Sequence, residues 1–147
     1  MLINNIKLQN FRNYDLLDLN LSKGINVFYG DNAQGKTNIL ESIFMCSIGR
    51  SFRTNKEKEI IKFGENFTKI NIEFNKNDRS GVIYYELSEK KYVSVNGIKL
   101  KKLSELLGNV NVVIFTPDDI NIIKGRTKYK KKIFRYNDRS IKACIYL

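Results

Sequence analysis

The segment that most constrains the fold of this 147-residue chain is a complete match to the phosphate-binding pattern G-x-x-x-x-G-K-[ST]. Its residues are Gly30, Asp31, Asn32, Ala33, Gln34, Gly35, Lys36 and Thr37. The two glycines permit backbone angles that direct successive N–H groups at phosphate oxygens, and a helix starting near Lys36 adds its positive end. The pattern predicts that Lys36 reaches the β- and γ-phosphates of a nucleoside triphosphate and that Thr37 binds Mg²⁺.

The flanking segments favour this interpretation, because a P-loop connects a strand to a helix. Residues 25–29 predict a compact apolar strand. Residues 37–48 predict a helix with one buried face, formed by Ile39, Leu40, Ile43, Phe44 and Ser47. A chance match is the alternative, and average residue frequencies give about one such match per few hundred chains of this length.

The rest of the chain predicts mainly antiparallel strands. Residues 2–8 and 15–21 predict neighbouring strands joined through residues 10–13, because apolar and polar side chains alternate. Further predicted elements are strands at 67–74, 81–87 and 92–95, a turn at Asn96-Gly97, a helix at 100–107, a buried strand at 110–115 and a helix start at Pro117. The predicted fold class is therefore α/β, a P-loop unit with a β-rich subdomain.

Hydrolysis of a triphosphate requires a carboxylate near Mg²⁺ and a group that orients water. Asp118 and Asp119 follow the predicted strand at 110–115, but Thr116 and Pro117 separate them from it. Acidic residues after a proline are typical of a helix N-terminus, which favours a capping role. No catalytic residue is predicted, and triphosphate binding without turnover is the expected behaviour.

The net charge of +11 is concentrated in the last residues of the chain. Residues 126–147 hold eight Lys or Arg and one acid, which gives +7, whereas residues 1–125 hold 18 basic and 14 acidic residues, which gives +4. Cys46 and Cys144 form neither a metal-ligand spacing nor a disulfide framework, and no signal peptide or membrane span is recognisable. These features predict a cytoplasmic protein.

Three segments outside the P-loop indicate which class of P-loop protein this chain resembles. They are residues 8–14 (LQNFRNY), residues 49–54 (GRSFRT) and residues 115–125 (FTPDDINIIKG). With the P-loop and residues 38–41 they resemble the RecF family of bacterial recombination and repair ATPases, which is related to SMC-type and ABC-type ATPase heads. The resemblance covers about residues 1–125 and implies the N-terminal lobe of such a head, with a mixed or antiparallel β subdomain.

The resemblance also implies a function. Family members are ATP-dependent DNA-binding proteins of replication and repair that act on single-stranded or gapped DNA in the response to DNA damage, including the SOS response. They dimerise around ATP and work with recombination mediator proteins. Arg12 matches an arginine beside the nucleotide phosphates in SMC-like heads, although it also fits a surface residue in a turn. Arg50 and Arg53 fit either DNA phosphate contacts or solvated side chains.

Family members are more than twice as long as this chain, so residues 1–125 are expected to be an N-terminal lobe of a truncated form. The signature motif and the acidic strand end would follow residue 147. If the tail is back-translated with A/T-rich codons, a one-base shift within the Lys130–Lys132 run gives Lys-Lys-Lys-Tyr-Leu-Asp, which resembles the family's own continuation, so we expect a frameshifted tail. A genuine basic tail is the alternative, and the nucleotide sequence distinguishes them.

Two other functional classes remain open at this point. A stand-alone P-loop NTPase or small kinase would require acceptor-binding and lid arginines after the P-loop, and the predicted strands at 67–95 do not fit that plan. A non-functional fragment would expose the apolar surface of an incomplete core. Phosphoryl transfer and cooperative unfolding, respectively, are the measurements that separate these classes from the first.

Overall fold

The computed structural model describes residues 1–77 and 79–115, and Met1–Val110 form one compact unit within them. The predictions for Pro117, Asp118, Asp119 and the tail lie outside the described residues. The elements in chain order are β1 (Leu2–Phe11), β2 (Tyr14–Asn20), α1 (Lys36–Ile48), the short 3₁₀ helix η1 (Glu57–Ile60), β3 (Thr68–Lys76), β4 (Arg79–Leu87), β5 (Lys91–Val95), β6 (Ile98–Lys99) and the 3₁₀ helix η2 (Leu103–Leu106).

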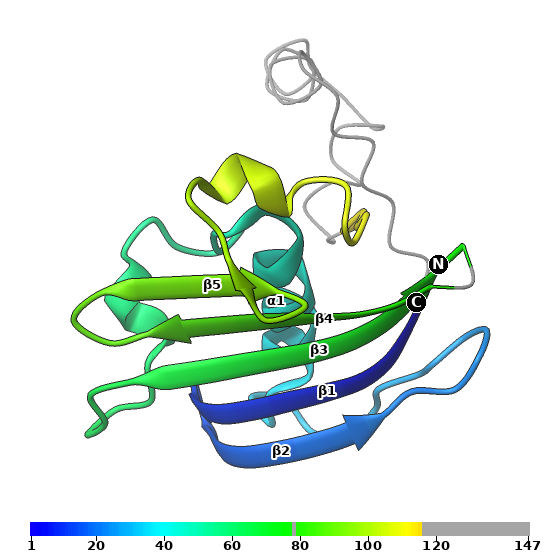
Figure 1. Cartoon of the computed structure of the whole chain (residues 1–147). Helices are drawn as coiled ribbons and strands as arrows, with labels where there is room; N and C mark the ends of the chain where they lie inside the picture. The colour runs from blue at the N-terminus through cyan, green and yellow to red at the C-terminus, as the bar shows by residue number, and fades with distance from the viewer. Residues whose placement is uncertain (78, 116–147) are drawn as a thin grey trace, which may run out of the picture. The chain divides into compact units, whose positions relative to one another are not determined.

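The six strands form one antiparallel sheet in the order β2-β1-β3-β4-β5-β6 (Figure 1). This order confirms the predicted β1–β2 pair and the β3–β4–β5 meander. β1 lies between β2 and β3, so the first strand of the chain is central and pairs with a strand about sixty residues later in the sequence. Asn96-Gly97 forms the predicted turn, with φ angles of 52° and 79° that suit Asn and Gly.

One face of the sheet is apolar and packs against α1, which lies behind the strands in Figure 1. The side chains of this face alternate with polar ones along each strand, as a half-buried strand requires. Fully buried members are Ile6, Leu8, Ile70, Ile72, Ile83 and Tyr85. The core of the unit therefore lies between the sheet and α1.

Helix α1 confirms the predicted helix and differs in which residues it buries. Leu40 and Phe44 are half-buried, whereas Glu41, Ser42, Met45 and Cys46 are buried with the expected Ile39, Ile43 and Ser47. The buried arc is wide because the loop after α1 returns beside the helix, where the Phe52 ring meets the Phe44 ring edge-on at 5.4 Å. A polar residue, Glu41, is thereby enclosed.

Three predicted elements are wrong. Residues 25–29 and 110–115 are not strands, because no described strand lies alongside either segment to complete a hydrogen-bond ladder. The apolar row of the first segment is consequently exposed: Ile25, Val27 and Tyr29 keep 78%, 73% and 90% of their accessible surface. The predicted helix at 100–107 is reduced to η2, which ends just before Gly108, where φ is 85°.

In the described part of the chain, no helix combines the length and the apolar character that crossing a membrane requires.

Candidate nucleotide-binding site

The P-loop winds around the ammonium group of Lys36. Lys36 Nζ donates hydrogen bonds to the carbonyl oxygens of Gly30 at 2.9 Å and Asp31 at 2.6 Å. The turn uses left-handed backbone angles at Ala33 and Gly35, with φ of 66° and 101°, and φ of 142° at Gly30. The intervening residues, Asp31, Asn32, Ala33 and Gln34, are exposed. The loop is thus a compact ring with its lysine at the centre.

The N-terminus of α1 is suited to an anion. Gly35 begins the helix without a side-chain cap, and no acidic residue lies in the first turn. The N–H of Asn38 makes the first helical hydrogen bond, to the Gly35 carbonyl at 2.8 Å, so the N–H groups of Lys36 and Thr37 precede the helical ladder. Thr37 is exposed beside them. This donor set suits an anion such as a phosphate group.

The β1–β2 turn packs directly against the P-loop. Asn38 Nδ2 donates to Asn13 Oδ1 at 2.7 Å, and Tyr14 Oη donates to the Gln34 carbonyl at 3.5 Å. Burial raises the pKa of Tyr14 above its usual value, so the hydroxyl remains a donor. A Cβ atom on Gly35 would lie 2.7 Å from Tyr14 Oη and 2.8 Å from Asn13 Oδ1. The second P-loop glycine is therefore required for packing as well as for backbone angle.

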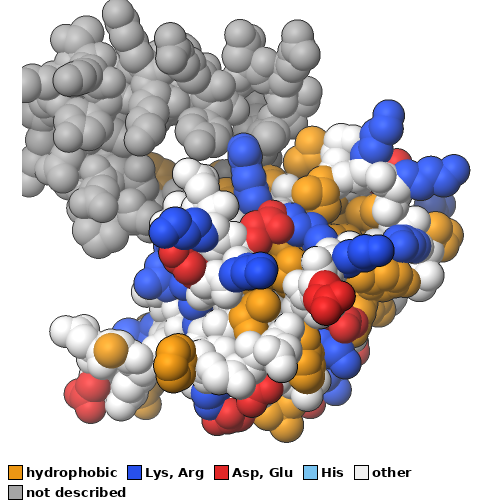
Figure 2. All heavy atoms as spheres, turned by 90° about the vertical axis from the view of Figure 1, so that its left-hand side faces the viewer, with side chains coloured by type: hydrophobic (Ala, Val, Ile, Leu, Met, Phe, Trp, Pro, Cys, Tyr) orange, Lys and Arg blue, Asp and Glu red, His pale blue; other side chains and the backbone are white. Residues whose placement is uncertain are grey.

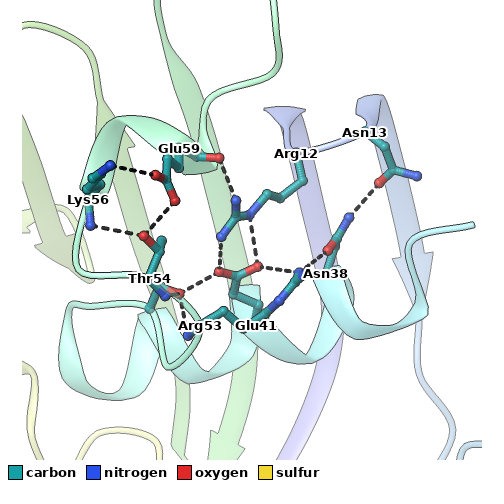
Figure 3. A network of polar contacts seen from close by, with 9 residues as sticks. Arg12, Asn13, Asn38, Glu41, Arg53, Thr54, Lys56 and Glu59 are labelled. Atoms are coloured by element: carbon teal, nitrogen blue, oxygen red, sulfur yellow. Dashed lines mark hydrogen bonds and ion pairs between the residues drawn. The ribbon is translucent and has the colours of Figure 1, made fainter. Parts of the chain in front are cut away.

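Arg12, predicted to lie beside nucleotide phosphates, is held on the side of α1 by Glu41 (Figure 3). Its Nε and Nη2 donate to the two carboxylate oxygens of Glu41 at 3.0 and 2.6 Å, and its Nη1 donates to the Glu59 carbonyl at 2.6 Å. The Arg12 backbone is left-handed, with φ of 55°, and non-glycine residues in this region often mark a functional constraint. Its contact with phosphate stays a prediction.

The loop at residues 49–54 binds the same carboxylate. Ser51 Oγ donates to Glu41 Oε1 at 2.5 Å, and Arg53 Nη1 donates to Glu41 Oε2 at 3.2 Å and to Asn38 Oδ1 at 2.6 Å. Arg53 is therefore anchored to α1, whereas sequence reasoning treated it as a loop arginine open to DNA or solvent. Arg50 is exposed.

Sequence reasoning missed Glu41 and Asn38, although both lie in the segment after the P-loop. Glu41 is completely buried, yet it is charged, and its four hydrogen bonds come from two distant segments. The sequence did hold a signal for this network. It places a glutamate on the buried arc of the predicted helix and an arginine in each flanking motif, residues 8–14 and 49–54. Such a carboxylate needs ionic partners, and Arg12 and Arg53 were the available ones.

An open groove of about 1110 Å³ lies beside this network. Its lining includes Arg12, Asn13, Asn38, Arg53, Lys62 and the fully exposed Phe63, together with three glutamates at positions 59, 65 and 89. Figure 2 views the end of the sheet where β1 and β4 end, and Lys and Arg side chains there are interspersed with acidic and apolar ones. The groove wall is mixed in charge, so this face is no continuous basic patch.

Comparison with known proteins agrees with the resemblance drawn from the sequence. The chain matches the AAA domain family over residues 5–145. It is 53% identical to the DNA replication and repair protein RecF of Clostridium novyi strain NT and 48% identical to that of Clostridium acetobutylicum, each over 134 residues. Those matches cover 90% of this chain and 37% of each relative.

Solved structures show the same relationship. The chain superposes on the recombination mediator protein RecF with ATP, in the RecFOR pathway, with a TM-score of 0.79 and 37% identity over 92% of this chain and 38% of that one. For the RecF-ATPrS structure the TM-score is 0.81 and the sequence identity is 38%, and the match covers 90% of this chain and 36% of that one. The SMC head domain from Thermotoga maritima shares the fold, with 17% identity and a TM-score of 0.61. That match covers 72% of this chain and 41% of the SMC head domain.

These neighbours confirm the expected class, an α/β P-loop ATPase head with an antiparallel β subdomain. The chain spans little more than a third of the length of the relatives it matches. It belongs to the AAA domain family, and its sequence is similar to those of RecF DNA replication and repair proteins.

Proposed function

We propose that this chain binds ATP with Mg²⁺ at residues 30–37, as the nucleotide-binding part of a RecF-type DNA replication and repair protein. The observation that carries the proposal is the P-loop ring around Lys36 followed by a helix N-terminus with no side-chain cap. Two solved RecF structures whose names include ATP or ATPrS support it, because this chain superposes on them closely.

The proposed roles follow from the positions of the side chains. Lys36 exchanges its two carbonyl partners for the β- and γ-phosphates, since an ammonium prefers anionic acceptors. The N–H groups of Gly30, Asp31, Asn32, Ala33, Gln34 and Gly35 supply the remaining donors of the loop. Thr37 binds Mg²⁺, and Arg12 contributes positive charge beside the phosphates. We assign no residue to hydrolysis and infer binding without turnover.

The wider activity is proposed for the full-length relative that this chain matches in part. It comprises binding of single-stranded or gapped DNA, ATP-dependent dimerisation, contact with recombination mediators, and cytoplasmic action in DNA damage repair and the SOS response. The groove wall mixes Lys and Arg with glutamates, so it lacks the continuous basic stripe that is typical of a DNA-binding face.

The test is a thermal melt of the 147-residue chain with and without ATP–Mg²⁺. A ligand at a hundred times its Kd stabilises the folded state by about 2.7 kcal/mol, which raises Tm by several degrees. Lys36→Ala should abolish the shift, while Lys23→Ala, which changes an exposed lysine outside the P-loop, should keep it. A shift that survives Lys36→Ala would place ATP elsewhere and refute the proposal.

The same protein distinguishes the alternatives. Phosphoryl transfer to a small acceptor would favour a stand-alone P-loop kinase, and steady ATP hydrolysis by the purified chain would favour a stand-alone NTPase. A non-cooperative melt with no response to ATP would identify a non-functional fragment. A cooperative melt with an ATP-dependent shift and no turnover supports the ATP-binding proposal.

A further inference from the structure

We propose that Glu41 is a positioning residue for nucleotide binding: it fixes the guanidinium groups of Arg12 and Arg53 beside the first turns of α1, where a triphosphate held by the P-loop meets them. This inference rests on the proposed ATP binding. The network that carries it joins three separate segments, the β1–β2 turn, helix α1 and the loop at residues 49–54 (Figure 3).

The hydrogen-bond geometry shows how Glu41 acts. Each of its carboxylate oxygens accepts two hydrogen bonds: Oε1 from Arg12 and Ser51, and Oε2 from Arg12 and Arg53. The Arg12 contact is bidentate, a geometry that fixes the plane of the guanidinium as well as its distance. Glu41 is completely buried, so solvent does not reach its carboxylate oxygens. The carboxylate therefore sets the position of both arginines.

Within the Arg12–Glu41–Arg53 cluster the positive charges outnumber the negative one. One carboxylate faces two guanidinium groups, so the three side chains together carry +1. Both arginines line the groove, where 18% of the Arg12 and 42% of the Arg53 side chain is exposed. Among the described contacts, Arg53 uses only Nη1, so its other donors are available to a ligand. An anion in the groove would meet pre-positioned donors.

The network also connects these arginines to the P-loop. Arg53 and Asn13 each contact the Asn38 amide, and Asn38 lies two residues after Lys36. Glu41 follows one helical turn later on the same side of α1. The helix turn that presents N–H groups to phosphate is thus fixed to both arginine-bearing loops. Loss of the Glu41 charge should alter phosphate binding without any direct contact between Glu41 and the nucleotide.

A purely structural ion pair is the competing explanation, since buried carboxylates commonly serve packing alone. Nucleotide affinity separates the two when stability is measured in parallel. We would determine the Kd of ATP–Mg²⁺ by titration calorimetry for the wild-type chain, Arg12→Gln, Glu41→Gln and the double variant. Glu41→Gln keeps the side-chain volume and removes the charge.

If Glu41 acts through Arg12, each single variant should weaken ATP binding about tenfold, and the double variant should bind hardly less tightly than either, since residues of one network are non-additive. Glu73→Gln, which changes an exposed glutamate on β3, should bind like wild type. An unchanged Kd in Glu41→Gln, with or without a lower Tm, would overturn the inference. Losses that multiply in the double variant would also overturn it, because the two residues would then act independently.

The failure of this inference is distinguishable from that of the proposed function. No ATP binding by the wild-type chain would refute both, whereas binding that Lys36→Ala abolishes and Glu41→Gln leaves intact would refute only the role of Glu41. If Glu41→Gln does not melt cooperatively, Arg12→Lys and Arg53→Lys give the same test, because lysine keeps the charge and loses the planar fork. Wild-type affinity in both lysine variants would overturn the proposal.

Discussion

At the scale of single residues, the P-loop depends on what packs against it as much as on its own pattern. The sequence pattern predicted the loop, its glycines and its lysine, because these follow from phosphate chemistry. It could not predict that Gly35 lies beneath Tyr14 and Asn13, or that Arg12 binds Glu41. Those contacts join residues far apart in the chain, and their geometry depends on the β1–β2 turn.

The packing of Gly35 leads to a comparison of two glycine variants. Gly24 and Gly35 both have positive φ, 93° and 101°, but a Cβ atom on Gly24 would have no atom within 4 Å. Gly24→Ala should cost about 1 kcal/mol of unfolding free energy through backbone strain alone. Gly35→Ala should cost about 1–3 kcal/mol more, because the Asn13 and Tyr14 side chains must shift. Urea unfolding measures both, and equal losses would show that the turn yields without cost.

At the scale of elements, alternation of apolar and polar residues predicted the antiparallel strands well. Each of these strands has a hydrogen-bonded partner in the described sheet: β1 pairs with β3, β3 with β4, and β4 with β5. The strand prediction failed for residues 25–29 for a physical reason. The apolar pattern shows which side chains a strand would bury, but burial also requires a neighbouring strand to cover them. Residues 25–29 keep their apolar row exposed.

The exposed row at residues 25–29 predicts self-association of the isolated chain. Ile25, Val27 and Tyr29 lie close together in the sequence and are all exposed, and exposed apolar side chains of one patch favour association between molecules. Val27→Lys places a charge in the row and should reduce association, measured by light scattering at increasing concentration. Its unfolding free energy should change by no more than about 0.5 kcal/mol, because Val27 is 73% exposed. Unchanged scattering would show that another surface drives association.

At the scale of the whole molecule, the chain has no histidine, so no side chain with an ordinary pKa between 5 and 8 titrates. Stability should therefore vary little around neutral pH. Burial raises the pKa of the Cys46 thiol. Burial also raises the pKa of Tyr85, and the nearby Glu57 and Cys46 side chains add to this shift. The folded state therefore retains protons that the unfolded chain releases above about pH 9 to 10. The unfolding free energy should fall as pH rises past these values.

Tyr85→Phe tests this expectation in the core. The Tyr85 hydroxyl is buried without a hydrogen-bond partner among the described residues, so removing it should raise the unfolding free energy by about 1 kcal/mol at pH 7. The variant should also lose less stability than wild type between pH 9 and 11, because one proton-retaining group is gone. Tyr84→Phe is the control, since that hydroxyl donates to Glu86 at 2.5 Å and its loss should be destabilising. A destabilised Tyr85→Phe would indicate a partner for the hydroxyl.

The central position of β1 has a consequence for when the phosphate site forms. Pairing of β1 with β3, from Leu2↔Asn75 to Gln9↔Lys69, closes a loop that contains the whole P-loop and α1. Closing a loop of about sixty residues costs chain entropy before any contact compensates it, so this pairing should form late in folding. Helix α1, which carries Lys36 and Thr37, packs on β3 and β4, so the site is complete only after closure. ATP would then stabilise contacts that form after the folding transition state, and its binding energy would appear as slower unfolding, with little acceleration of folding.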